Sequence, residues 1–333
     1  MNTLISKVSE RLQTAPEKIK LTKLHGDASN RIYYRIEIEN KPNFILMQLP
    51  AGPSSVSEEI TNATTKPSEL PFVNIDRFLR SKNLPAPEIV SYDAQEGLMI
   101  LEDFGPETFE KRILASNNQE KINWYQKAID LLMILQKQCL PDQNCIAFSR
   151  SFDAKLLNWE FDHFFEYGIE ARLNIKIDPK DLLTLRELGN KITTHLISLP
   201  QIFVHRDFQS RNLMVQDQKL KLLDFQDALM GPQPYDLVAL LRDSYIALNS
   251  QELSTLVNYY SKDEIFFRDF DWMTIQRKLK DAGRFVYIDQ VKKNPSFLVH
   301  IPNSLQYVKE AFQRRPELGN FLELLKKYVP EWR

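Results

Sequence analysis

Residues 201–236 read QIFVHRDFQSRNLMVQDQKLKLLDFQDALMGPQPYD, and the rest of the chain is interpreted outward from them. A short apolar strand precedes the loop His205–Asn212, and a second apolar run, Leu213–Gln216, follows it. The polar pair Asp217-Gln218 then separates that run from a third, Leu220–Leu223. Two apolar runs on either side of a polar turn predict a β-hairpin.

Three polar side chains, Asp207, Asn212 and Asp224, are expected at the mouth of this hairpin. A carboxylate and an amide oxygen from two loop positions suit Mg²⁺, which prefers oxygen ligands. A second carboxylate can accept the proton of an attacking hydroxyl. We therefore predict a phosphoryl-transfer site, with Asp207 as the catalytic base and Asn212 and Asp224 as metal ligands. The alternative is a surface hairpin with solvated acids, which the flanking apolar strands disfavour because unpaired charge is costly there.

Composition excludes several classes of protein. The 333 residues carry 43 basic and 44 acidic side chains, so the net charge of −1 predicts no nucleic-acid partner. No apolar run reaches transmembrane length, and the N-terminus does not resemble a signal peptide. Two cysteines, Cys139 and Cys145, match no metal or disulfide pattern and are interpreted as inert thiols. A cytoplasmic protein without a membrane association is expected, while its protein partners and oligomeric state are not predicted.

The N-terminal third has the pattern of a small, mostly antiparallel sheet. Apolar and polar residues alternate from Ile32 to Ile38, and a second strand is expected at Phe44–Gln48. Residues 50–70 are rich in Pro, Ser and Thr and are interpreted as a mobile surface insert. An amphipathic helix follows, and then a strand pair at Ile89–Tyr92 and Leu98–Leu101.

Gly105-Pro106 ends this pattern, and helices dominate afterwards. We place the boundary between a first lobe, 1–103, and a second, 104–333, which carries the catalytic and metal-binding hairpin within 201–227. The expected helices of the second lobe are 121–138, 152–167, 180–197, 235–247, 251–260, 271–291, 303–314 and 317–328. The fold class is therefore α+β, a protein-kinase-like fold with a small sheet lobe and a larger helical lobe.

The nucleotide is expected between the two lobes. The loop Gly26–Arg31 enters the first strand pair and can offer the Ser29 hydroxyl and the Arg31 guanidinium to phosphates, although a plain loop is an equal alternative. Glu102 and Phe104 should present backbone groups to adenine. The strand Phe44–Gln48 lacks the lysine that clamps ATP phosphates in kinases, and we hypothesise that Arg31 supplies the missing charge.

At this point a family resemblance can be stated. HRDFQSRNLM, LLDFQDA and PYDLVALLRDSY resemble the aminoglycoside/choline phosphotransferase superfamily over nearly the whole chain. GDAS, PFVNIDRFL, LEDFG and the WExD pattern at 159–162 are similar, in the same order, to the anomeric N-acetylmuramate/N-acetylglucosamine kinases of bacterial cell-wall recycling. The resemblance implies ATP and Mg²⁺ as cofactors, a cytoplasmic location and a small-molecule acceptor, with an amino sugar phosphorylated at its C1 hydroxyl. These sugar kinases are also similar in lacking the lysine.

The residues independently favour a small molecule over a protein as the acceptor. Only ten residues separate Asp224 from Tyr235, too few for the phosphorylatable loop of a protein kinase. The alternatives are a kinase for another sugar, an aminoglycoside or a choline-like alcohol, and a pseudokinase that only binds. Near-neutral charge gives no support to a strongly cationic acceptor.

Candidate acceptor residues are expected on the helix that begins at Phe152 and near the catalytic loop. Trp159, Glu160 and Asp162 could stack on and hydrogen-bond a sugar, with a core tryptophan and a solvated acid as the alternative. Arg211 could neutralise the transferred phosphate or form a scaffold ion pair, and Asp227 could face the acceptor or bond structurally. Further candidates, including an arginine for a lactyl carboxylate, are Arg242, Asp243, Arg277, Lys278 and Lys280. Asp236 is interpreted as an anchor for the catalytic loop.

Overall fold

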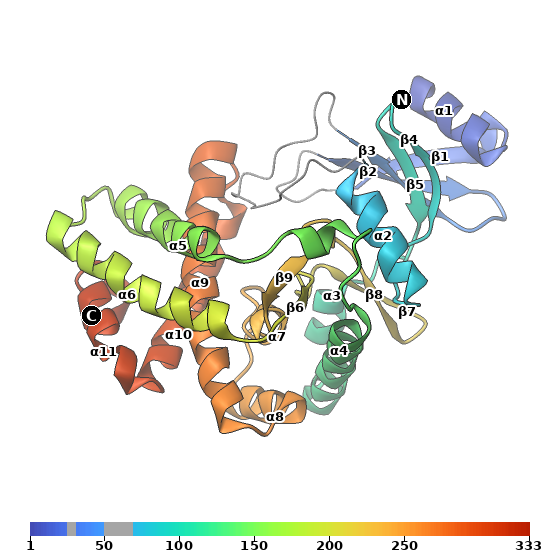
Figure 1. The fold of residues 1–333 in the computed structure, drawn as a ribbon. Coiled ribbons are helices and arrows are strands. Elements are labelled where there is room, and N and C mark those ends of the chain that lie inside the picture. The colour runs from blue at the N-terminus through green and yellow to red at the C-terminus, as the bar shows by residue number, and fades with distance from the viewer. Residues whose placement is uncertain (25–30, 50–68) are drawn as a thin grey trace.

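The structure is a computed structural model that describes residues 1–24, 31–49 and 69–333. The predicted insert at 50–70 lies almost entirely outside the described residues, and so does Ser29. The five strands of the N-terminal lobe are β1 (Ile19–Lys23), β2 (Ile32–Ile38), β3 (Phe44–Gln48), β4 (Ile89–Asp93) and β5 (Leu98–Glu102). They form one sheet in the order β1-β2-β3-β5-β4, with antiparallel neighbours throughout (Figure 1).

Each face of this sheet is covered by a different helix. The alternation predicted for β2 is confirmed, because Tyr34 and Ile36 are buried against α1 (Asn2–Leu12). Met47 of β3 faces the other way and joins a core that includes α2 (Pro71–Ser81). Strand β1 was not predicted, because this edge strand buries only its first residue and so shows no apolar alternation.

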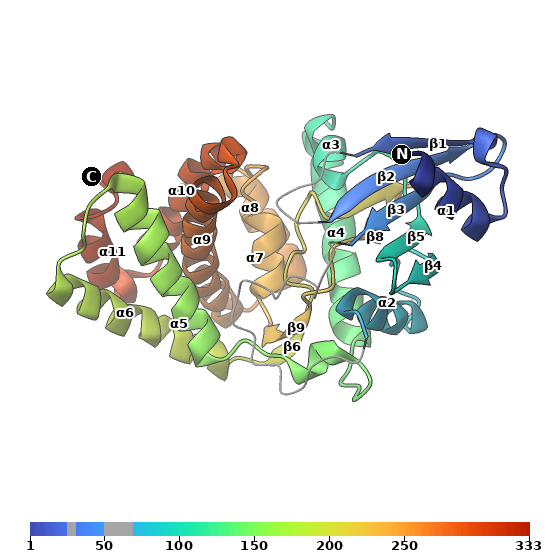
Figure 2. The same cartoon turned by 90° about the horizontal axis from the view of Figure 1, so that it is seen from above.

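The C-terminal lobe is mostly helical. Its α-helices are α3 (Phe109–Leu114), α4 (Asn118–Gln138), α5 (Ala154–His163), α6 (Pro179–Ser198), α7 (Tyr235–Leu241), α8 (Ser250–Tyr260), α9 (Glu264–Lys292), α10 (Ile301–Gln313) and α11 (Gly319–Lys326). This lobe also contains the π-helix η3 (Phe164–Ala171) and the short 3₁₀ turns η2 (Ile146–Ser149), η4 (Pro295–His300), η5 (Pro316–Leu318) and η6 (Pro330–Trp332). A further 3₁₀ turn, η1 (Pro16–Lys18), lies in the N-terminal lobe. The α+β, kinase-like two-lobe fold expected from the sequence is confirmed. Figure 2 shows the sheet at one end and helices α5, α6 and α9–α11 at the other.

Two small hairpin-like pairs lie between these ends. The predicted hairpin is formed by β7 (Leu213–Gln216) and β8 (Lys219–Leu222), and both residues of its turn, Asp217 and Gln218, have positive φ. The strand before the catalytic loop, β6 (Gln201–Val204), pairs with β9 (Leu229–Pro232), which the sequence did not predict. The pairing β6–β9 fixes the short segment after Asp224 against the catalytic loop.

Two helix predictions need correction. The helix expected at 235–247 ends at Leu241, because Asp243 turns inward to accept backbone N–H groups of Ser210 and Tyr245. The helix expected at 152–167 widens into the π-helix η3 after His163. Gly283 of α9 approaches this junction so closely that a β-carbon would lie 2.9 Å from the Cα of Phe164. The absence of a side chain at 283 therefore lets α9 pack directly on the backbone of η3.

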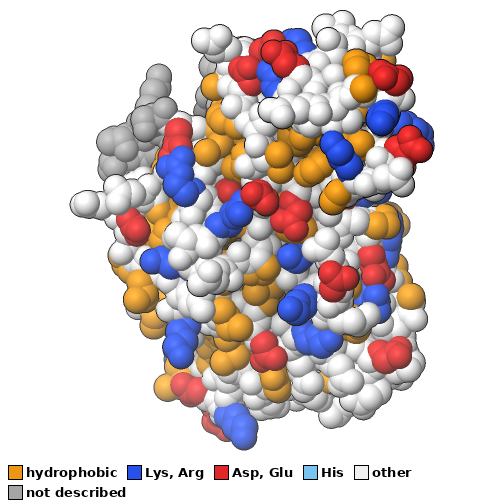
Figure 3. All heavy atoms as spheres, turned by 90° about the vertical axis from the view of Figure 1, so that its right-hand side faces the viewer, with side chains coloured by type: hydrophobic (Ala, Val, Ile, Leu, Met, Phe, Trp, Pro, Cys, Tyr) orange, Lys and Arg blue, Asp and Glu red, His pale blue; other side chains and the backbone are white. Residues whose placement is uncertain are grey.

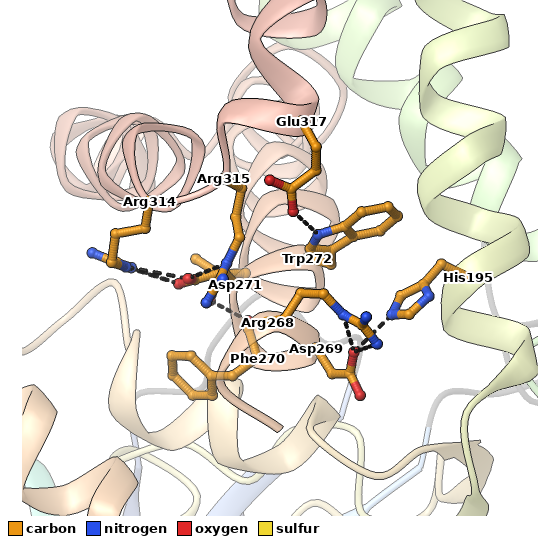
Figure 4. A network of polar contacts seen from close by, with 10 residues as sticks. His195, Arg268, Asp269, Phe270, Asp271, Trp272, Arg314, Arg315 and Glu317 are labelled. Atoms are coloured by element: carbon orange, nitrogen blue, oxygen red, sulfur yellow. Dashed lines mark hydrogen bonds and ion pairs between the residues drawn. The ribbon is translucent and has the colours of Figure 1, made fainter. Parts of the chain in front are cut away.

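Helix α9 packs against several other elements of the C-terminal lobe. It begins seven residues before its predicted start, and the side chain of Asp263 caps it. Polar contacts of three residues near its N-terminal end, Asp269, Asp271 and Trp272, hold it in place (Figure 4). Asp269 accepts from His195 of α6 at 2.7 Å, and Trp272 donates to Glu317 at 3.3 Å. Asp271 accepts from Arg314 at 2.6 Å and from Arg315 at 2.8 Å. These contacts fix α9 against α6 and the end of α10.

Candidate active site

Asp236 holds the start of the catalytic loop in place through hydrogen bonds to the backbone. Its carboxylate accepts the backbone N–H groups of His205 at 2.6 Å and of Arg206 at 3.0 Å. Burial raises the pKa of Asp236 to about 7, against the opposing effect of these two hydrogen bonds and of Arg277. The interpretation of Asp236 as an anchor is confirmed. Asp243, considered as an acceptor contact, instead accepts the backbone N–H of Ser210 at 2.8 Å and fixes the far side of the loop.

Two residues at this site adopt left-handed backbone conformations. Arg206, just before Asp207, has φ of 78°, and Asp224 has φ of 62°. Such conformations cost about 1–2 kcal/mol for residues other than glycine. Strain of this kind persists where surrounding contacts impose it, and it is concentrated at functional sites. Here it directs Asp207 and Asp224 toward the same space.

Asn212 and Asp224 meet as the sequence predicted. The amide nitrogen of Asn212 donates to the backbone carbonyl of Asp207 at 3.0 Å and lies 3.5 Å from Oδ2 of Asp224. Because the nitrogen is engaged, the amide oxygen is the atom that Asn212 can offer to a cation. Gln226 donates to Oδ1 of Asp224 at 2.8 Å and orients that carboxylate. The pair supplies the oxygen ligands that a hard divalent cation requires, with further positions left for phosphate oxygens and water.

Electrostatics also distinguish Asp224. Burial raises its pKa to about 6, and the neighbouring charge of Asp207 adds to this shift, while Gln226 and Arg31 oppose it. A buried carboxylate with a second carboxylate beside it is unfavourable without a cation. The arrangement therefore favours occupation by a positive charge.

Asp207 is the accessible carboxylate of the set. Its side chain is 31% exposed, and its Oδ1 lies 3.7 Å from Nη2 of Arg277, whose side chain is 2% exposed. His205, by contrast, is buried with its ring edge-on to Phe208, and burial lowers its pKa to about 4. The imidazole is therefore neutral near pH 7. This placement supports the interpretation of Asp207 as the group that meets an acceptor and of His205 as scaffold.

The N-terminal lobe brings one cation toward this centre. Tyr33 of β2 is hydrogen-bonded by Arg31, and burial raises its pKa while Arg31 lowers it and Asp224 raises it. Arg31 and Tyr33 thus lie near enough to Asp224 for their charges to interact. On β3, Met47 pairs with Tyr33 of β2 and is fully buried. The strand that carries the phosphate-clamping lysine in kinases therefore contributes a methionine here.

The expected nucleotide-contact residues Glu102 and Phe104 lie where the sheet ends. Glu102 accepts the backbone N–H of Glu88 through Oε2 at 3.2 Å, and Phe104 is buried beneath Lys221. Between them, Asp103 pairs with Arg35 of β2 at 2.6 Å, which ties the link between the lobes to the sheet.

The three acceptor candidates on α5 are not brought together. Trp159 is half-buried and stacks on His163. Glu160 is fully buried and accepts from Gln276 of α9 at 2.6 Å, and burial raises its pKa. Asp162 faces α6, where it pairs with Arg186 at 2.8 Å, with both side chains largely exposed. Trp159 therefore contacts a residue of its own helix, whereas Asp162 forms the solvated ion pair that the sequence left open as an alternative.

The two remaining candidates lie at the edges of the catalytic loop. Arg211 forms a two-pronged ion pair with Glu110 of α3 and stacks on Tyr245, with its guanidinium carbon 3.7 Å from the ring centre. This geometry is the scaffold ion pair that the sequence left open as an alternative. Asp227 lies 3.4 Å from the side-chain nitrogen of Gln226, which also bonds Asp224.

The surface around the N-terminal lobe carries charges of both signs. Figure 3 views the molecule from the side of the five-stranded sheet, and acidic and basic side chains are interspersed over that face. Among the helices that the structure describes, none is long and apolar enough to cross a membrane.

A two-lobed fold with this catalytic loop and this pair of oxygen ligands defines a small-molecule kinase. The chain belongs to the phosphotransferase enzyme family, whose model matches residues 20–273. It is 29% identical to the N-acetylmuramate/N-acetylglucosamine kinase of Pseudomonas putida, over 92% of this chain and 87% of that protein. It is also 29% identical to the protein of that name from Neisseria meningitidis, over 97% and 95% of the two chains. The resemblance stated from the sequence is confirmed.

Solved structures show the same fold at lower identity. Choline kinase LicA from Streptococcus pneumoniae has a TM-score of 0.64 and 15% identity, covering 92% of this chain and 98% of its own. The ADP-bound aminoglycoside phosphotransferase APH(2'')-Ib has a TM-score of 0.60 and 14% identity, with coverage of 94% and 99%. These likenesses establish the kinase-like fold.

Proposed function

We propose that this chain is an ATP- and Mg²⁺-dependent kinase that phosphorylates the C1 hydroxyl of N-acetylmuramate and N-acetylglucosamine in peptidoglycan recycling. The observation that carries the proposal is the convergence of Asp207, Asn212 and Asp224 in a chain whose curated relatives bear that name. Since ATP is available in the cytoplasm, the proposal places the enzyme there. It also keeps 103/104 as the boundary between the nucleotide-covering and catalytic lobes.

In this proposal Asn212 and Asp224 would hold the cation, which would supply positive charge to the phosphates of ATP. Arg31 supplies the positive charge that β3 lacks, which its electrostatic effect on Asp224 supports. Ser29 contacts phosphate, although it lies outside the described residues. The backbone at Glu102 and Phe104 receives adenine at the junction of the lobes.

Asp207 orients the acceptor hydroxyl and accepts its proton. The position of this carboxylate is as important as its basicity, because phosphoryl transfer depends mainly on alignment and charge stabilisation. Its side chain is partly exposed, which leaves it accessible to an acceptor. The acceptor itself is proposed to lie between α5 and the catalytic loop, with Trp159 and Asp227 as candidate contacts. Glu160, Asp162 and Arg211 are the weaker members of that set, because Glu160 is fully buried against Gln276 and the other two are engaged in ion pairs.

The test is ATP turnover with Mg²⁺ against N-acetylmuramate, N-acetylglucosamine, choline and an aminoglycoside, with ³¹P NMR of each product. An acid-labile sugar 1-phosphate from the amino sugars is the expected result. Turnover of choline or of the aminoglycoside alone would overturn the substrate assignment and leave a phosphotransferase. Binding of Mg-ATP without turnover of any of these acceptors would overturn the substrate assignment and keep the fold, and failure to bind Mg-ATP would favour a pseudokinase.

A further inference from the structure

Arg277 lies against the catalytic carboxylate although it comes from a helix 70 residues further along the chain. Its Nη2 is 3.7 Å from Oδ1 of Asp207, and its guanidinium stacks on Tyr235 at 4.6 Å. We propose that Arg277 is a positioning residue that holds Oδ1 of Asp207 and so leaves Oδ2 directed at the acceptor hydroxyl. The inference rests on phosphoryl transfer at Asp207 and does not depend on which acceptor is used.

The burial of Arg277 requires an explanation that folding alone does not give. Its side chain is 2% exposed, and its Nε and Nη1 have no hydrogen-bond partner in the described structure. A buried, incompletely paired guanidinium is destabilising relative to an apolar side chain of similar size. Burial lowers the pKa of Arg277, but Tyr235, Asp281, Asp207 and Asp236 together raise it overall, so the cation is retained. The charge is kept where it acts on the catalytic loop.

The position of Arg277 is fixed from two sides. Polar contacts of Asp269, Asp271 and Trp272 hold α9 against α6 and the end of α10 (Figure 4). Tyr235, one residue before the loop anchor Asp236, lies under the guanidinium. Because neither the helix nor the tyrosine can shift without breaking these contacts, the guanidinium is a rigid reference point for Asp207.

The arrangement assigns each oxygen of Asp207 a task. The proton of the acceptor hydroxyl passes to Oδ2 as the acceptor oxygen bonds to the γ-phosphorus and the bond from that phosphorus to ADP breaks. Oδ1 stays beside Arg277 throughout. Without the cation, the carboxylate is free to rotate toward other donors, and a misplacement of about 1 Å costs on the order of 100-fold in rate.

The test compares Arg277→Met, Arg277→Lys and a matched control, Arg242→Met, on whichever acceptor the wild type phosphorylates. Arg242, a candidate acceptor residue from the sequence, is instead engaged with α10, where it stacks on Tyr307 at 4.9 Å and pairs with Glu310 at 2.8 Å; because it is also buried, it is a suitable control. Arg277→Met should lower kcat about 100-fold with KM values changed less than about twofold, and Arg277→Lys should recover about tenfold of the loss. Arg242→Met should retain the wild-type kcat.

A second comparison separates positioning from direct contact with phosphate or acceptor. In an Asp207→Ala background, Arg277→Met should cost less than about twofold further, because a residue that acts through Asp207 has nothing left to position. An equal loss in both backgrounds, or a raised acceptor KM with unchanged kcat, would overturn the proposal. If Arg277→Met does not fold, the same comparison between the wild-type and Asp207→Ala backgrounds is made with Arg277→Lys.

A readout independent of activity keeps this inference separate from the proposed function. In crystal structures, the Asp207 carboxylate of Arg277→Met should be rotated from its wild-type orientation, whereas that of Arg242→Met should not. An unchanged carboxylate would overturn the positioning role even if no amino sugar were phosphorylated. Conversely, a rotated carboxylate in an enzyme that turns over only choline would support the role of Arg277 and reject the amino-sugar assignment.

Discussion

Phe72 of α2 packs on Phe225, with ring centres 4.8 Å apart, and Phe225 directly follows Asp224. The only helix on the inner face of the sheet thus touches the segment that carries the candidate metal ligand, among the residues described. Phe78, one and a half turns further along α2, packs instead on Phe148 and Phe203. Two buried phenylalanines of one helix therefore pack on different parts of the C-terminal lobe, and only Phe72 contacts the residue next to Asp224.

We expect Phe72→Ala and Phe78→Ala each to lower the free energy of unfolding by about 3–5 kcal/mol, since both rings are buried. Phe72→Ala should in addition weaken Mg-ADP binding by about tenfold, because Asp224 loses its support. Denaturant unfolding and titration calorimetry measure the two effects. Equal loss of nucleotide affinity in both variants would show that only general destabilisation is involved.

Asp207→Ala should reduce kcat by about 10²–10⁴-fold, the range of general acid–base catalysis. Stability should change little, because the side chain is partly exposed and Arg277 keeps the neighbouring charges of Asp281 and Asp236. Steady-state turnover and thermal unfolding, measured on the same preparation, give the answer. Turnover within tenfold of wild type would place the base elsewhere.

Arg31→Ala should raise the KM for ATP by about tenfold, the worth of one charge-assisted hydrogen bond. Lys20→Ala is the control, because that lysine pairs with Glu37 on the sheet and is 74% exposed. Initial rates over a range of ATP concentrations measure both. An unchanged KM and kcat in Arg31→Ala would mean that another residue supplies the positive charge for the ATP phosphates.

Mg²⁺ affinity should depend on pH through Asp224. Burial raises the pKa of this carboxyl to about 6, so the group is mostly protonated at pH 5 and ionised at pH 8. A cation binds the ionised form, and affinity should therefore fall by about tenfold per pH unit below pH 6 and be constant above about pH 7. Calorimetry of Mg-ADP binding from pH 5 to 8 tests this, and equal affinity at the two ends would contradict it.

The two thiols should be unreactive in the native protein. Burial raises the pKa of Cys139 to about 12 and that of Cys145 to about 11, so the thiolate fraction at pH 8 is on the order of 0.1% or less. A chromogenic disulfide reagent should label neither cysteine within minutes in native buffer and both in guanidinium chloride. Rapid labelling of one thiol in the native state would show that its surroundings open.

Local patterns predicted the hairpin β7–β8 and the inner strands of the sheet, because an apolar alternation and a polar turn are short-range signals. Strand β9 was missed because its residues Leu229–Pro232 contain Gly and Pro, and only pairing with β6 makes them a strand. The termination of α7 and the role of Asp243 depend on a contact with Ser210 some 30 residues away. Arg277 was visible only as one basic residue in a cluster, because its neighbour Asp207 is distant in sequence.

Asn212 and Asp224 were predictable because spacing and strand context together fix where such side chains lie. Trp159 and Asp162 were not, since helical spacing gives the angle between side chains on α5 and not which helix each one meets. Asp162 pairs with Arg186 of α6, while Trp159 stacks on His163, four residues further along α5 itself. The contact of Asp162 with another helix is the part that helical spacing could not give.

The short segment from Phe225 to Pro234 is held by the pairing of β6 with β9, and Asp236 binds the catalytic loop without help from any modified residue. A protein kinase separates its inactive and active forms by rearranging this part of the chain. Here the equivalent segment has too few residues to offer a second arrangement, so the enzyme is assembled as soon as it folds.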